Sequence, residues 1–178
     1  MTIKGILALF HLLLLVSAAI HAKPPANTEE VGANAAFARL KSLAGNWESV
    51  GPNGEHSRLN YQVISAGTAV MERFTSDDLP HKSGSMITVY YIDRGQLVLT
   101  HYCIAGNQPH LRATAYDPQT GELDFDFVDG GNIVTGEEGH MHSARMGFVD
   151  EDHISSEWQF MQARSPKFTE LSQFTRVK

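Results

Sequence analysis

The chain has 178 residues, 42% of them hydrophobic, which is typical of a single domain with a substantial core. Its formal net charge is −6 and its Lys and Arg residues form no run, so we expect no nucleic-acid partner. Cys103 is the only cysteine, which excludes an internal disulfide. Stability must therefore come from core burial and strand pairing.

Residues 1–22 have the pattern of a secretory signal peptide. Lys4 gives a positive start, residues 5–20 are almost continuously apolar, and Ala19 and Ala22 suit a cleavage site. This apolar stretch of about 16 residues is shorter than the roughly 20 that a spanning helix needs. An uncleaved membrane anchor is the alternative. We expect a secreted or periplasmic protein with no stable membrane insertion once the signal is removed.

The next two segments lead into the domain. Residues 23–34 contain Pro24, Pro25 and Gly32 and predict a flexible lead-in. Residues 35–43 then predict a short helix that ends before Gly45, with three apolar side chains on one face, namely Phe37, Leu40 and Leu43.

Beyond Gly45 the hydrophobic period changes from helical to two. Segments of alternating residues are separated by turn residues, and no helical segment lies between them, which favours antiparallel pairing. A meander of this length must close or stack to hide its edges, so residues 35–178 predict an all-β, up-and-down antiparallel barrel of about ten strands. A two-sheet sandwich is the alternative. The first expected strand begins at Trp47, and the others are 57–65, 68–74, 85–92, 96–104, 110–116, 122–128, 139–149, 153–161 and 168–177.

The segment Leu43-Ala44-Gly45-Asn46-Trp47 resembles the opening Gly-x-Trp motif of the lipocalin and fatty-acid-binding-protein superfamily. In that superfamily a short helix precedes the motif, the tryptophan plugs one end of the barrel, and an arginine late in the last strand lies over it. The resemblance implies these roles for Trp47 and Arg176. An indole can fill a wide dry end, and a guanidinium can stack on its face.

Other segments resemble an uncharacterised family of small bacterial lipocalin-like proteins. The chain departs from many secreted lipocalins because it has no cysteine pair. The resemblance implies the fold and leaves the activity open. The segments that carry it are 37–47, 86–90, 99–103, 106–109, 140–142 and 157–158.

Histidines are the most prominent candidates for chemistry. His140 and His142 are two apart on an expected strand, so they share a face with the apolar residues Ala144, Met146 and Phe148 and are predicted to point inward. His101 shares a face with Leu97, Leu99 and Cys103, which predicts the same orientation. The other histidines beyond residue 22 are His56, His81, His110 and His153.

Three inward histidines admit two interpretations. His101, His140 and His142 could form an open three-ligand metal site, or one of them could bind haem. Alternatively, they hydrogen-bond to Tyr90, Asn107 or water inside a polar cavity. Cys103 is expected to be a buried structural cysteine, because same-face neighbours on a strand lie too far apart for direct proton transfer from His101.

The remaining in-strand charges are less informative. Glu72 is expected to face outward and the face of Arg112 is undecided. The acidic residues of the 122–128 segment alternate with phenylalanines and are expected to be solvated.

The sequence therefore predicts a barrel that binds a small hydrophobic or amphipathic molecule in its interior. A metal- or haem-binding barrel and an enzyme of unknown reaction are the alternatives; no catalytic residue, cofactor or oligomeric state can be assigned. The expected ligand-binding residues are Tyr90, His101, Asn107, Arg112, His140, His142 and Trp158.

Overall fold

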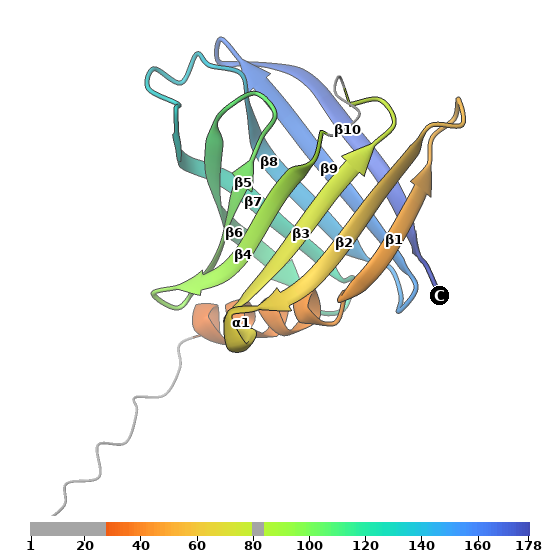
Figure 1. Ribbon diagram of the computed structural model, residues 1–178. Coiled ribbons are helices and arrows are strands. Elements are labelled where there is room, and N and C mark those ends of the chain that lie inside the picture. The colour runs from red at the N-terminus through yellow and green to blue at the C-terminus, as the bar shows by residue number, and fades with distance from the viewer. Residues whose placement is uncertain (1–27, 80–83) are drawn as a thin grey trace, which may run out of the picture.

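The computed structural model describes residues 28–79 and 84–178, so the predicted signal peptide (residues 1–22) and His81 lie outside the described residues. Ten antiparallel strands close into a barrel in which every strand pairs with its sequence neighbours and β1 pairs with β10 (Figure 1). The fold class predicted from the alternating pattern is thereby confirmed. The strands are β1 Gly45–Val50, β2 His56–Ile64, β3 Ala69–Ser76, β4 Met86–Asp93, β5 Gln96–Tyr102, β6 Gln108–Asp117, β7 Glu122–Gly131, β8 His140–Phe148, β9 His153–Gln162 and β10 Ser165–Arg176.

One α-helix is found among the described residues: α1 Thr28–Lys41 lies across one end of the barrel (Figure 1). Phe37, Leu40 and Leu43 are buried, as their spacing predicts. The helix begins at Thr28 rather than at Ala35, so it includes residues 28–34 of the predicted lead-in. No helix within the described residues is long and apolar enough to cross a membrane.

The end next to α1 is sealed around Trp47. The indole is fully buried and donates a hydrogen bond from Nε1 to the carbonyl of Leu43 over 2.8 Å. The Arg176 guanidinium lies 4.2 Å above the ring, which is the contact expected from the sequence. It also donates to the carbonyls of Ser42 and Ala44, so one side chain joins the last strand to the segment after α1. We call this region the closed end.

The interior next to the closed end is filled with apolar side chains. These side chains reach the interior because alternate residues of each antiparallel strand point inward. The largest buried members of this core are Tyr61, Tyr90, Leu97, Leu99, Leu111, Leu123, Phe125 and Ile154.

An irregularity in β8 changes which side chains reach the interior. The pairing of β8 with β9 shifts between Met141 and Ser143, so His142 is an extra residue in that strand. A bulge reverses the faces on its far side. Ala144 remains in the core, whereas at the start of the strand it is Met141 that lines the interior.

Candidate functional site

The opposite end of the barrel, which we call the mouth, is hollow. It holds a cavity of about 810 Å³ bordered by the β1–β2 turn, the segment after β3, the β5–β6 loop and the strands β9 and β10. Most of the large side chains on its walls are apolar: Phe74, Leu79, Met86, Ile104, Met141, Phe160, Phe168 and Leu171.

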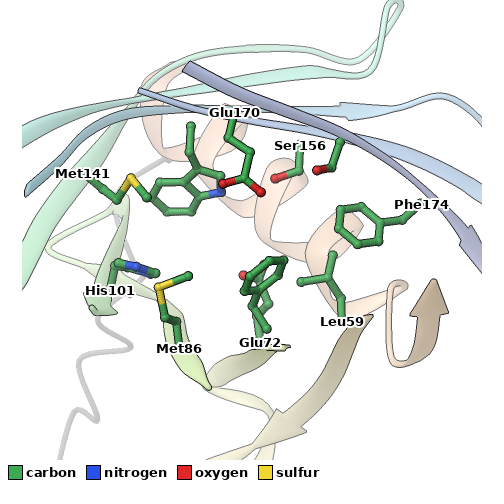
Figure 2. A pocket seen from close by; sticks show the side chains of 11 residues that line it. Leu59, Glu72, Met86, His101, Met141, Ser156, Glu170 and Phe174 are labelled. Carbon is green, nitrogen blue, oxygen red and sulfur yellow. The ribbon is translucent and has the colours of Figure 1, made fainter. Parts of the chain in front are cut away.

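The mouth continues downward into a smaller inner cavity of about 30 Å³. The two share wall residues, including Phe74, Met86 and Met141. Figure 2 shows Glu170 and Ser156 on one wall, and His101, Met86 and Glu72 on the opposite wall. A space of this size accommodates about one water-sized group. It can therefore receive the head of a ligand whose body occupies the mouth.

A row of buried polar side chains crosses four adjacent strands beneath this cavity. Strand pairing places Tyr61 opposite Glu72, Glu72 opposite Thr88, and Thr88 opposite His101. Directly opposed residues project from the same face of a sheet. All four side chains are at most 5% exposed, so the row lies in the interior. We call these four residues the polar row.

Glu72 is the centre of the polar row. Its Oε2 accepts hydrogen bonds from the hydroxyls of Tyr61 and Tyr90 at 2.7 and 2.8 Å, and its Oε1 accepts one from Thr88 at 3.3 Å. Burial raises the pKa of Glu72, and the three donors oppose this shift. Burial, together with the nearby Glu72, raises the pKa of both tyrosines well above the usual value, so both phenols keep their protons.

His101 occupies the end of the polar row that faces the cavity. Its Nδ1 lies 3.0 Å from the Thr88 hydroxyl, and its ring packs against Trp158 with ring centroids 4.9 Å apart. Its Nε2 is buried and has no hydrogen-bond partner. Burial lowers the pKa of His101 to about 4, so the imidazole is neutral at pH 7.

The direction of these hydrogen bonds follows from the number of available protons. When Thr88 donates its one hydroxyl proton to Glu72, its oxygen can accept only from His101, which places the imidazole proton on Nδ1. The Nε2 atom is then a bare acceptor on a side chain that lines the inner cavity. A ligand with a hydrogen-bond donor would satisfy it.

Carboxylates dominate the charge of both cavities. Glu55, Asp78 and Glu170 border the mouth, and Glu72 and Glu170 border the inner cavity. No Lys or Arg of the described residues lines either one. Burial within the mouth, with a contribution from Asp78, raises the pKa of Glu170. The charged side chains on the described walls of both cavities are therefore all acidic.

Three of the residues expected to bind ligand meet in this region. His101 and Trp158 line the inner cavity, and Tyr90 supports it from below through Glu72. Asn107 is buried but lines neither cavity; its amide donates to the carbonyl of Gly139 over 2.7 Å and joins the β5–β6 loop to the segment before β8. Cys103 is half-buried at the mouth, and burial raises the pKa of its thiol.

The predicted role of Arg112 in the interior is wrong. Arg112 is exposed, whereas its neighbour Leu111 is fully buried, so strand alternation places the guanidinium on the outer face. Its partners across the pairing are Val98 and Asp126.

His140 is buried and His142 is partly exposed, and the β8 bulge breaks the parity on which their shared inward orientation was based. Neither lines the inner cavity or the mouth. His140 Nε2 lies 3.1 Å from His142 Nδ1, and both rings pack on Phe127. Within residues 28–79 and 84–178, no group of three His, Cys, Asp or Glu side chains is arranged to hold a metal ion. The predicted three-ligand site of His101, His140 and His142 is therefore not formed.

Two important residues were missed. Glu72 was expected to face outward, but it is buried; Val70 and Phe74, two positions to either side, point inward and were the available signal. Glu170 shares its parity with Phe168, Ser172 and Phe174, which also line the cavities. For Glu72 the charge suggested the wrong face although alternation indicated the correct one, and for Glu170 no prediction was made although alternation with Phe168 and Phe174 indicated the interior.

The chain forms a closed ten-stranded antiparallel barrel that is sealed at one end and hollow at the other. No protein-family model matches the sequence, and no curated protein matches it. A crystal structure of a protein of unknown function from Nostoc punctiforme, assigned to the DUF3598 family, is 9% identical, covers 85% of this chain and 100% of its own, and superposes with a TM-score of 0.26. So low a score carries no functional inference.

Proposed function

We propose that the barrel binds a small, partly apolar molecule that enters through the mouth and places one end in the inner cavity. The observation that carries this proposal is a hollow of about 810 Å³ with apolar walls, which shares wall residues with an inner cavity lined by His101, a side chain with an unpartnered imidazole nitrogen. Pockets of about 300–1,000 Å³ with apolar walls and a few placed polar groups are typical of small-molecule sites. The contact between Trp47 and Arg176 supports a lipocalin-like barrel, and such a fold is compatible with ligand binding in the interior.

A fluorescent probe with no charge tests the proposal directly. We expect Nile red to bind the purified protein with one site per chain and a rise in emission, because its rings match the apolar walls. Ser172→Phe should weaken binding at least about tenfold, since Ser172 borders both cavities and a phenyl ring there would fill the passage.

A matched substitution provides the control. Ser143 precedes the inward Ala144 on β8 and lies opposite Asp126 on the outer face, so Ser143→Phe should leave Nile red binding unchanged. Absence of Nile red binding, or equal weakening by both variants, would overturn the proposal. Mass spectrometry of the protein isolated from its own host should find a co-purifying small molecule.

Export is a separate part of the proposal. It is supported by the signal-like pattern of residues 1–22. N-terminal sequencing of the protein recovered from its host should find a mature chain that begins near residue 23. A cytoplasmic protein that retains Met1 would contradict it.

A further inference from the structure

The charge and hydrogen bonding of the site narrow the chemistry of the ligand, an inference that rests on the proposed function. An anionic head would enter a region lined by Glu55, Asp78, Glu170 and Glu72, with no Lys or Arg on the described walls. Like charges in a partly desolvated space repel more strongly than in water. The site therefore disfavours carboxylates and phosphates.

Of these acidic groups, Glu170 is the one placed to meet a ligand. Glu72 is already occupied by three hydroxyl donors. Within the described residues Glu170 has no hydrogen bond and no ion pair, and Figure 2 shows its carboxylate directed into the inner cavity. The Glu170 side chain keeps contact with solvent at the mouth despite the partial burial that raises its pKa, and its ionised form would attract an incoming cation.

A second observation points to the same head group. His101 is 4% exposed, lines the inner cavity, and has a Nε2 with no partner. With the imidazole proton on Nδ1, Nε2 accepts a hydrogen bond. An unsatisfied buried acceptor is costly, so a ligand that donates to it gains affinity. The adjacent Trp158 ring adds an aromatic face that attracts cations.

We propose that the ligand is a positively charged amphiphile, an alkyl or aryl amine, which binds head first. Its ammonium group lies between the Glu170 carboxylate and His101 Nε2, against Trp158. Its apolar body occupies the mouth along Phe74, Met86 and the neighbouring apolar walls.

Three probes that share one chain length separate the contributions of charge and hydrogen bonding. Decylamine, decanol and decanoate would each be titrated against the Nile red complex at pH 7. We expect decylamine to displace the dye at a concentration about tenfold lower than decanol, and decanoate to be the weakest. Decanol, like decylamine, has a hydrogen-bond donor at its head, but it carries no charge.

Two variants assign the effect to particular atoms. Glu170→Gln should reduce the affinity for decylamine to that for decanol and leave decanol unchanged. His101→Leu should weaken both, because it removes the acceptor that both donors use. The matched control is Glu157→Gln. Glu157 precedes the inward Trp158 and lies opposite Arg145 on the outer face, so this substitution should change neither the affinity for decylamine nor that for decanol.

The possible failures are distinguishable. If Nile red itself does not bind, the proposed function fails. If Nile red binds but decanoate displaces it as well as decylamine does, or if Glu170→Gln leaves the preference for decylamine intact, the inference about charge is wrong and the proposed function stands.

Discussion

The two ends of the barrel use similar side chains for different purposes. At the closed end, Trp47 is fully buried, its Nε1 is hydrogen-bonded and its face is covered by Arg176. At the mouth, Trp158 is only partly buried and packs against His101 beside an open space. Satisfied contacts thus characterise the end that stabilises the barrel, whereas an unpaired imidazole nitrogen and exposed apolar walls characterise the end available for binding.

Truncating each tryptophan tests most directly whether the two ends of the barrel are packed differently. Trp47→Ala should lower the free energy of unfolding by about 3–5 kcal/mol, because it removes a packed indole and leaves a void under Arg176. Trp158→Ala should cost less, since one side of this ring already faces a cavity. Urea denaturation measures both. Equal losses would show that the two ends are packed alike.

The second prediction concerns pH and His101. In the folded protein its pKa is about 4, and in the unfolded chain about 6.5. The unfolded chain therefore takes up the proton first, and stability present above pH 6.5 is lost as the pH falls toward 4. The loss is at most about 3 kcal/mol. His101→Gln should lack this contribution, as measured by urea denaturation across this range; an identical pH dependence in both proteins would contradict it.

A smaller effect is expected at Gly45, whose φ of 130° is unfavourable for other residues. A Cβ at this position would also lie 3.2 Å from Nη1 of Arg176. Gly45→Ala should lower the free energy of unfolding by about 2 kcal/mol. Gly136→Ala is the control, because Gly136 also has a positive φ but its Cβ would meet nothing within 4 Å. An equal loss of unfolding free energy in Gly136→Ala would show that crowding of the added Cβ against Arg176 does not destabilise the closed end.

The smallest predicted effect is kinetic and uses Cys103, the single cysteine, which borders the mouth. Bound decylamine should slow alkylation of the thiol by iodoacetamide a few-fold, since the ligand body covers part of the wall. The rate is followed by mass spectrometry, and Ser172→Phe should abolish the protection. Protection that persists in this variant would place the amine elsewhere.

The sequence was sufficient for the fold because alternation is a local signal that repeats in every strand. It identified ten strands, and the resemblance supplied Trp47 and Arg176. It could not locate the bulge at His142, because an extra residue leaves no mark in composition, so it did not predict that Met141 would line the inner cavity in place of His142. The polar row was missed for another reason: it joins residues from four strands, and their opposition depends on register, which only the assembled sheet defines.

That polar row has a consequence for assembly. If β3 paired one residue out of step, Arg73 would take the interior position of Glu72, and the hydroxyls of Tyr61 and Tyr90 would be buried without an acceptor. Such a mispaired barrel would be disfavoured by every lost hydrogen bond and by a desolvated guanidinium. The buried carboxylate thus discriminates against slipped strands, and the same atoms that form the floor of a binding cavity help the chain select a single arrangement.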